Sequence, residues 1–208
     1  MSVTPEDVTR LEMCLTDGGV AVIPTDTVYG LACNPASATA VRRVYELKRR
    51  PPAKPAAVMF FSLQPALKLL AELGPQTRRA LGALLPGPVT LLLPNPEQRF
   101  PLVCDPRGTG SALLGLRVPA FVGPLALLVG VGVPVAQSSA NLSGGSDPRR
   151  LQDVPVELRE GADLMLDGGE LPGSASTVID LAEYEQNGDW RIVREGPLQQ
   201  TALERLLV

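Results

Sequence analysis

Segments with helical spacing alternate with short apolar runs along almost the whole chain, and this alternation limits the folds that it can adopt. Apolar residues at helical spacing predict helices at residues 5–16, 38–49, 65–73, 76–85 and 124–129. Short apolar runs predict strands at residues 20–24, 56–61, 89–93, 112–118, 133–137, 164–166, 177–181 and 190–193. Helices and strands that interleave in this way favour an open α/β sheet flanked by helices.

Local signals refine this prediction. Thr4 is expected to cap the first helix and Pro5 to occupy its first turn. The turn signal Asn187-Gly188 lies between the last two predicted strands, so they are expected to pair as a hairpin in a mixed sheet. Residues 94–110 are rich in proline, glycine and charge and are predicted to form a long loop.

The size and composition indicate one compact unit. The chain has 208 residues, of which 45% are hydrophobic and 20% charged, and this is enough to fill one core. A single domain over residues 1–208 is expected, closed by a short helix at residues 197–208. Residues 1–10 lack a secretory signal, and glycines and prolines interrupt the apolar run at 121–137. A cytoplasmic protein without a membrane span is expected.

The chain contains no histidine, which removes several kinds of chemistry. Ser-His-Asp and Cys-His catalysis and HExxH zinc sites are excluded. Cys14, Cys33 and Cys104 are too far apart in sequence for a paired metal knuckle and are expected to be core residues. The net charge of −3 gives no overall attraction to nucleic acid.

A threonine-rich segment, PTDTVYGL at residues 24–31, follows the first predicted strand. Side chains that follow a buried strand emerge at the rim of an α/β sheet, where these hydroxyls can contact a small polar ligand. The alternative is a turn in which Asp and Thr side chains bond to their own backbone.

Four cations lie within seven residues where the predicted helix 38–49 ends: Lys48, Arg49, Arg50 and Lys54. Arginine forks and lysine point charges both bind phosphate oxygens, so the cluster fits a polyphosphate ligand. The alternative is the general preference of cations for a helix C-terminus.

A small polar loop, SSANLSGG at residues 138–145, follows the strand predicted at 133–137. Consecutive N–H groups and hydroxyls in such a loop can hold an anion, although a simple turn explains them too. Neither a GxxxxGK[ST] motif nor a GxGxxG motif after a predicted strand occurs. Arg117 and Arg194 stand at strand ends, where the residues alone favour pairing with surface acids over convergence on an anionic ligand.

Taken in order, PTDTVYGL, KRRPPAK, PGPVT, LRVP, SSANLSG, LDGG, STVID and REG resemble the YrdC/TsaC family of threonylcarbamoyl-adenylate synthases, from about residue 18 to residue 197. The resemblance is to the short, single-domain members. It implies a twisted open mixed α/β sheet, the YrdC-like fold, with a concave basic cavity. It implies a nucleotidyltransferase that makes threonylcarbamoyl-AMP and pyrophosphate from L-threonine, bicarbonate and ATP. The product would serve the N6-threonylcarbamoyladenosine (t6A) modification of tRNA.

The resemblance also implies roles for single residues. The implied catalytic residues are Lys48, Arg50, Ser139 and Asn141. The implied ATP-binding residues are Arg50, Lys54, Ser139, Asn141, Thr177 and Arg194. The implied threonine-binding residues are Thr27, Arg117 and Gln137, the last through its backbone. Met59 replaces a histidine that many relatives have near the threonine pocket, and methionine cannot donate a hydrogen bond. Mg²⁺ is expected with the nucleotide, without protein metal ligands.

Two other functions remain open from the sequence. The cation cluster, if it forms one exposed turn, fits an RNA-binding module in ribosome or tRNA maturation, although the charge balance disfavours it. Carbamoyl-adenylate chemistry occurs in larger hydrogenase-maturation proteins that contain a similar domain, but their acylphosphatase-like and zinc-finger regions are absent here. For a synthase, the expected partners are the tRNA threonylcarbamoyl transferase proteins that act next, with weak RNA binding as a further possibility.

Overall fold

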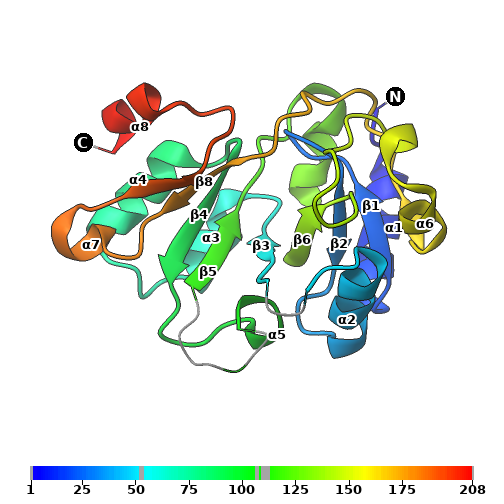
Figure 1. Cartoon of the computed structure of the whole chain (residues 1–208), viewed down its shortest axis with the longest axis horizontal. Helices are drawn as coiled ribbons and strands as arrows, with labels where there is room; N and C mark the ends of the chain where they lie inside the picture. Colours follow the sequence, from blue (N-terminus) through cyan, green and yellow to red (C-terminus); the bar gives the residue numbers. More distant parts are fainter. Residues whose placement is uncertain (1, 52–53, 106–107, 109–112, 208) are drawn as a thin grey trace.

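The computed structural model describes residues 2–51, 54–105, 108 and 113–207. Within these residues the strands form one sheet in the order β7-β1-β2-β6-β3-β5-β4-β8-β9 (Figure 1). The strands are β1 Val20–Ile23, β2 Gly30–Cys33, β3 Ala57–Met59, β4 Val89–Pro94, β5 Leu113–Arg117, β6 Val135–Ser139, β7 Leu164–Met165, β8 Thr177–Asp180 and β9 Arg191–Arg194. The α-helices are α1 Pro5–Thr16, α2 Ala38–Leu47, α3 Leu63–Leu69, α4 Pro75–Leu84, α5 Pro101–Cys104, α6 Val156–Glu160, α7 Tyr184–Asn187 and α8 Gln200–Leu206.

The sheet mixes both strand directions, as the sequence predicted. Strands β1 and β7, β3 and β5, and β4 and β8 pair in parallel. The other neighbouring pairs are antiparallel. Helices α1, α2 and α6 gather near β1 and β2, whereas α4, α7 and α8 gather near β4 and β8 (Figure 1). The predicted open mixed sheet with flanking helices is therefore confirmed.

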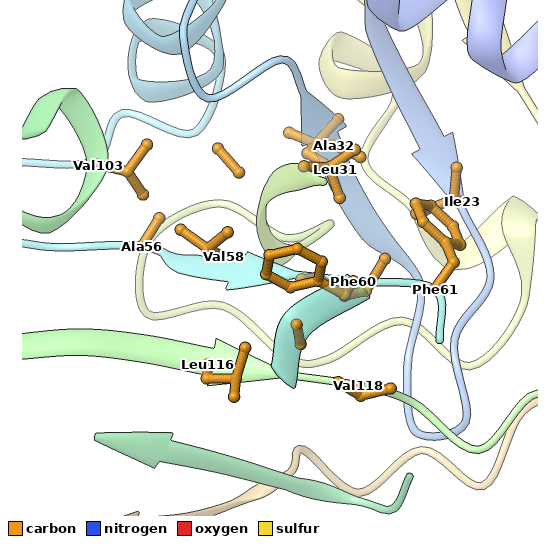
Figure 2. Close-up of a cluster of buried hydrophobic side chains, with 14 of the residues drawn as sticks. Ile23, Leu31, Ala32, Ala56, Val58, Phe60, Phe61, Val103, Leu116 and Val118 are labelled. Carbon is orange, nitrogen blue, oxygen red and sulfur yellow. The ribbon is translucent and has the colours of Figure 1, made fainter. Parts of the chain in front are cut away.

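The core lies between the sheet and its helices. Side chains from β1, β2, β3, β5 and α5 meet in the cluster drawn in Figure 2. Phe61 of this cluster stacks on Phe121, with ring centroids 5.7 Å apart. No helix in the described ranges is both long enough and apolar enough to cross a bilayer.

The first helix begins where the sequence predicted. The Asp7 amide donates to Thr4 Oγ1 at 3.2 Å, and the Asp7 carboxylate accepts from the Thr4 amide at 3.0 Å. This reciprocal capping box satisfies amides that the first helical turn leaves free. Pro5 occupies the first turn, where its missing N–H costs nothing.

Several predicted elements differ in the structure. Strand β2 was missed because its four buried residues, GLAC, show no alternation. Helix α2 ends at Leu47, two residues before the predicted end, with Lys48 as its C-cap. The helix predicted at 124–129 is the 3₁₀ helix η1, Gly123–Gly130. Neither α6 nor the 3₁₀ helix η2, Leu151–Asp153, was predicted, since both are short.

The predictions for the turn at Asn187-Gly188 and for the loop at residues 94–110 also need correction. Gly188, with φ +80°, caps α7 rather than forming a tight hairpin turn, although β8 and β9 pair antiparallel as expected. The predicted loop 94–110 contains α5, while its residues 106, 107, 109 and 110 lie outside the described residues. Four residues of other predicted segments also lie outside the described residues. They are Pro52 and Ala53 of the KRRPPAK motif, Ala112 of the strand predicted at 112–118, and Val208 of the predicted last helix.

Candidate active site

A cavity of about 530 Å³ opens over the middle of the sheet. It is lined from strands β3, β4, β5, β6, β8 and β9 and from the segment after α2. Five of the predicted site residues line it: Arg50, Arg117, Gln137, Ser139 and Arg194. The charged side chains among its described lining residues are these three arginines and Asp105. Residues far apart in sequence are thus brought together around one cavity.

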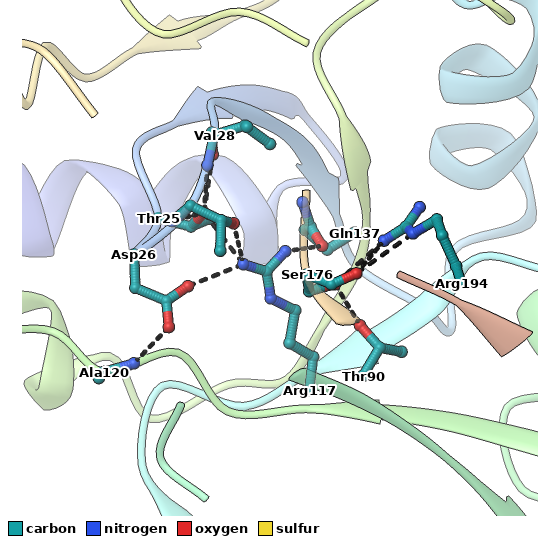
Figure 3. Close-up of polar contacts among 10 residues, drawn as sticks. Thr25, Asp26, Val28, Thr90, Arg117, Ala120, Gln137, Ser176 and Arg194 are labelled. Carbon is teal, nitrogen blue, oxygen red and sulfur yellow. Dashed lines mark hydrogen bonds and ion pairs between the residues drawn. The ribbon is translucent and has the colours of Figure 1, made fainter. Parts of the chain in front are cut away.

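Arg117 forms the floor of the cavity and is buried, with an exposed fraction of 4%. Its Nη2 donates to Asp26 Oδ1 at 2.8 Å and to Thr25 Oγ1 at 3.2 Å, and contacts Thr27 Oγ1 (Figure 3). Its Nη1 donates to Gln137 Oε1 at 3.3 Å. Burial lowers the pKa of Arg117, and Asp26 opposes that shift. The surface pairing that the residues alone favoured is therefore wrong for Arg117.

The segment PTDTVYGL forms the local turn that the sequence left open as one interpretation, and its hydroxyls also contact Arg117. Thr25 Oγ1 donates to the Val28 carbonyl at 2.7 Å and accepts from the Val28 amide at 3.3 Å, so it closes a local turn. Thr27 is fully buried and reaches Arg117 but is not part of the cavity lining. Asp26 was not predicted as a site residue, although its position inside the motif was a usable signal. Its carboxylate holds Arg117 and accepts from the Ala120 amide at 2.9 Å.

Lys48 was expected to be exposed where α2 ends. It is buried instead, with an exposed fraction of 1%. Its ammonium donates to the Asn141 carbonyl at 2.7 Å and to Asn141 Oδ1 at 3.1 Å, and contacts the Ser139 carbonyl. Burial, and then Arg50, lower the pKa of Lys48 to about 8, while Asp147 acts in the opposite direction. Lys48 therefore links the end of α2 to the loop after β6 and does not line the cavity.

Within that loop, Ser139 and Asn141 have different positions. Ser139 lines the cavity, and its hydroxyl donates to Asn141 Oδ1 at 2.7 Å. The Asn141 side chain also donates to the Gly145 carbonyl at 2.6 Å and is absent from the cavity lining. Asn141 thus shapes the loop, and Ser139 presents its surface to the cavity.

Arg50 lies at the edge of the cavity. Arg49 has φ +50°, a left-handed conformation that turns the chain sharply after α2. The Arg50 guanidinium donates to the Pro55 carbonyl at 2.6 Å and to Ser138 Oγ at 3.5 Å. Lys54 contributes its carbonyl, which accepts from Arg50 Nε at 3.2 Å, whereas its exposed side chain is not part of the cavity lining.

The opposite wall is formed by β4, β8 and β9. Arg194 Nη2 donates to the Ser176 carbonyl at 2.7 Å and to Ser176 Oγ at 3.1 Å (Figure 3). Ser176 Oγ lies 2.8 Å from Thr90 Oγ1, and burial lowers the pKa of Arg194. Ser176 and Thr90 both line the cavity but were not predicted. Their motifs, STVID and PGPVT, were the available signal.

Thr177 faces away from this wall. It is fully buried, and its hydroxyl donates to the Leu198 carbonyl at 3.1 Å and accepts from the Leu198 amide at 3.0 Å. Its neighbours Ser176 and Val178 line the cavity instead, because successive side chains of a strand point to opposite faces. Met59 is likewise fully buried and is not part of the lining.

Comparison with known proteins decides the family. The Sua5/YciO/YrdC family model, described as "Telomere recombination", matches residues 13–196.

The chain belongs to this family.

Two similar relatives are named threonylcarbamoyl-AMP synthase. The protein of Pyrococcus abyssi is 31% identical over 93% of this chain and 55% of its own length. The protein of Mus musculus is 34% identical over 88% of this chain and 64% of its own length. The chain therefore spans between about half and two thirds of the length of these curated relatives.

Solved structures of the Sua5/YciO/YrdC family share the fold. P. abyssi Sua5 complexed with L-threonine superposes with a TM-score of 0.84 and 28% identity, covering 99% of this chain and 58% of the other. Escherichia coli YciO superposes with a TM-score of 0.77 at 23% identity, covering 93% and 90% of the two chains. The family and fold that the motif order suggested are confirmed.

The family motif LDGG has a structural explanation in this chain. The Tyr29 hydroxyl donates to the Gly169 carbonyl at 2.8 Å and accepts from the Gly168 amide at 3.0 Å. A Cβ at Gly168 would lie 2.6 Å from Pro24 Cβ and 2.7 Å from Leu125 Cδ2, so a glycine is needed there. The motif therefore holds the turn after β7 against the segment PTDTVYGL through these hydrogen bonds. Val28 of that segment lines the cavity.

Proposed function

We propose that this member of the Sua5/YciO/YrdC family makes L-threonylcarbamoyl-AMP from L-threonine, bicarbonate and ATP. The observation that carries the proposal is the convergence of Arg50, Arg117, Arg194 and Ser139 on one cavity. Several anionic groups must be held close together in this reaction, and clustered guanidiniums suit that task. The names of the relatives point to the same product.

The proposed chemistry needs no histidine. The threonine amine and bicarbonate form an N-carboxy group with loss of water. A carboxylate oxygen of that group attacks the α-phosphorus of ATP, and the bond from this phosphorus to the bridging oxygen of the β-phosphate breaks. Pyrophosphate leaves with the bonding electron pair. Positioned cations and hydroxyls stabilise the charge that develops on the phosphate oxygens, which is the main contribution expected from such a site.

The walls of the cavity suggest a division of roles. Arg50 and Ser139 lie on one side and are proposed to bind the phosphates of ATP, with Arg194 contributing from the opposite wall. Arg117 on the floor is proposed to hold the carboxylate of threonine. Lys48 and Asn141 support this arrangement by shaping the loop that carries Ser139.

Mg²⁺ is proposed to enter with ATP as part of the substrate. In the described part of the chain no three Cys, Asp or Glu side chains cluster in a way that could hold a metal ion. The magnesium would neutralise phosphate charge while coordinated mainly by phosphate oxygens and water.

We further propose that residues 1–208 work as one domain and that the product passes in the cytoplasm to a transferase acting on tRNA. The RNA-binding alternative rested on four cations on one exposed turn. Lys48 is buried, so this turn offers one fewer cation than the sequence suggested. Salt-dependent RNA binding at low ionic strength would be the result that favours this alternative.

Pyrophosphate release from ATP tests the proposal directly. The purified protein should release pyrophosphate with bicarbonate and L-threonine, and much less when threonine is omitted or replaced by serine. Arg50→Met should lower turnover by about a hundredfold or more, the usual effect of losing a group that stabilises developing charge. Arg42→Met removes an exposed arginine of the neighbouring α2 helix and should leave turnover unchanged. Release that does not depend on threonine would reject the proposed substrate.

A further inference from the structure

Arg194 stands at the edge of the sheet, yet hydrogen bonds hold its side chain. It is the last residue of β9, and β9 is the last strand in the sheet order. Its Nε and Nη2 donate to the Ser176 carbonyl at 3.2 and 2.7 Å, and Nη2 also donates to Ser176 Oγ at 3.1 Å. A free arginine side chain samples many rotamers, and holding it in one of them costs conformational entropy. The contacts with Ser176 therefore fix a group that would otherwise move.

The same contacts leave one side of the guanidinium open. A guanidinium carries five N–H donors, and those on Nε and Nη2 point to Ser176. Within the part of the chain that the structure describes, no hydrogen bond is made by Arg194 Nη1, and Arg194 lines the cavity. Ser176 thus holds one side of the guanidinium, and the other side is left for a ligand.

Thr90 fixes the hydroxyl of Ser176 in turn. A guanidinium cannot accept a hydrogen bond, so Ser176 Oγ must accept from Arg194. Thr90 Oγ1 lies 2.8 Å from Ser176 Oγ (Figure 3). A hydrogen bond between these two oxygens fixes the rotation of the Ser176 hydroxyl, whichever oxygen donates, and keeps a lone pair directed at Arg194. The contacts therefore run from Thr90 through Ser176 to Arg194.

The Thr90 hydroxyl is not needed to build the sheet. Strands β4 and β8 pair in regular parallel register along the whole of β8. Thr90 faces the cavity together with Leu92 of the same strand and Val178 of β8. These two neighbours are apolar, so packing on this face of the sheet does not require a hydroxyl. The polar contact that Thr90 makes on this face is with Ser176.

The backbone beside Arg194 is held as well. A Cβ at Gly196 would overlap the Thr177 amide nitrogen, so a glycine is needed there. The Thr177 hydroxyl donates to the Leu198 carbonyl and accepts from the Leu198 amide. The chain after β9 therefore lies directly against the chain at the start of β8. This packing places Arg194 beside Ser176, and the hydroxyl of Thr90 completes the arrangement.

We infer that Thr90 is a positioning residue for ATP binding, because it holds Arg194 through Ser176 with Nη1 open to the cavity. The inference rests on the proposed function, in which Arg194 binds the phosphates of ATP. Phosphate oxygens accept strong hydrogen bonds from a guanidinium. An arginine that is fixed before the ligand arrives loses less side-chain freedom on binding, so more of its interaction energy appears as affinity. Thr90 acts in this way only through Arg194.

Two variants at Thr90 test the hydroxyl. Thr90→Val removes the hydroxyl and keeps the branched shape. It should raise both the Kd and the KM for ATP by about 3-fold to 10-fold, the usual effect of one neutral hydrogen bond. Thr90→Ser keeps the hydroxyl and should bind ATP as wild type does, and neither variant should change the KM for threonine. Calorimetric titration with ATP alone gives the Kd, and pyrophosphate release gives the KM values.

Thr77→Val is the matched control, because Thr77 is also buried but lies in α4, outside the cavity lining. It should leave the Kd and the KM for ATP unchanged. A double-mutant cycle with Arg194→Met shows whether Thr90 acts through the arginine, because Thr90→Val should then have no further effect on ATP binding.

Several results would overturn the inference. They are an unchanged Kd for ATP in Thr90→Val, equal effects of Thr90→Val and Thr90→Ser, an equal effect of Thr77→Val, and a full effect of Thr90→Val in the Arg194→Met protein. The KM for threonine rising together with that for ATP would also count against it, since a general disturbance of the cavity would then explain the loss.

A measurement on the unmodified protein keeps the inference testable if a Thr90 variant does not fold. Without ligand, the Arg194 Nε–H group should be as rigid as the backbone, with an NMR order parameter near about 0.85, and a value below about 0.6 would contradict positioning. The proposed function fails separately, through absence of threonine-dependent pyrophosphate release by a protein that binds ATP. The Kd values for ATP would still decide the role of Thr90 in that case.

Discussion

Lys48 shows how burial changes the role of a charge that the sequence places beside exposed arginines. Its ammonium has three N–H donors, and the structure gives it three oxygen acceptors on Ser139 and Asn141. No donor is left for a phosphate. Arg50, two residues further on, lines the cavity, so it is the residue of the cluster that we propose binds phosphate.

Replacing Lys48 should therefore destabilise the fold as well as the site. Lys48→Met leaves carbonyl groups of the 139–141 loop without their partner, at a cost of about 1 to 3 kcal/mol in the free energy of unfolding. Denaturant unfolding measures this change. Arg42→Met removes an exposed charge from the same helix and should change the free energy of unfolding by less than about 0.5 kcal/mol. Equal stability of the two variants would mean that the Lys48 contacts contribute nothing.

The pH dependence of stability offers a second test of the same residue. The pKa of Lys48 is lowered to about 8 in the folded protein, against about 10.4 for an unfolded lysine. Between these values the unfolded chain binds more protons, so the free energy of unfolding contributed by Lys48 rises with pH. The difference between wild type and Lys48→Met should therefore grow in favour of wild type from about pH 8 to about pH 10. A constant difference across this window would show that the lysine is not perturbed.

Among the elements, glycines decide where two segments can pack closely. Gly168 lies in the turn after β7 against Pro24 and Leu125, where a side chain does not fit. Gly82 lies in helix α4, and a Cβ there would meet nothing within 4 Å. The same residue type is thus required in one element and tolerated in the other.

Alanine at these two glycines should have opposite effects. Gly168→Ala should lower the free energy of unfolding by about 1 to 3 kcal/mol through overpacking. Gly82→Ala should raise it by about 0.5 to 1 kcal/mol, since alanine favours a helix more than glycine does. Thermal unfolding of the two proteins measures both. Destabilisation by Gly82→Ala would indicate that its surroundings are tighter than the structure shows.

Across the whole molecule, the cavity depends on one buried ion pair between distant parts of the sheet. Asp26 follows β1, and Arg117 ends β5, with β2, β6 and β3 between them in the sheet order. Both side chains are buried, with exposed fractions of 4% for Arg117 and 8% for Asp26. A buried charge that loses its partner is costly, so this pair couples the loop after β1 to the floor of the cavity.

Asp26→Asn should lower the free energy of unfolding by about 3 kcal/mol or more. Combining it with Arg117→Met should cost less than the sum of the two single changes, because the buried charge is then gone. A double-mutant cycle measured by denaturant unfolding gives the coupling. Asp163→Asn disrupts the half-exposed pair with Arg43 and should cost no more than about 1 kcal/mol. Additive effects at Asp26 and Arg117 would contradict the coupling.

Much of the architecture was predictable because it depends on local patterns. Capping residues, helical spacing and short apolar runs located most helices and strands, and the order of the motifs identified the family. The fully buried strand β2 and the short helices α6 and α7 were missed, because four or five residues carry too little periodicity.

Sequence alone determined the class of fold, the family and the segments that could carry chemistry, because periodicity and motif order are properties of the chain itself. Only the tertiary structure decided which side chains face the cavity. Lys48 and Thr177 are turned into the protein, whereas Ser139 and Arg194 line the cavity. The direction of a side chain depends on strand pairing and on partners that are distant in sequence, such as Asn141, Leu198 and Arg117, and spacing along the chain does not contain that information.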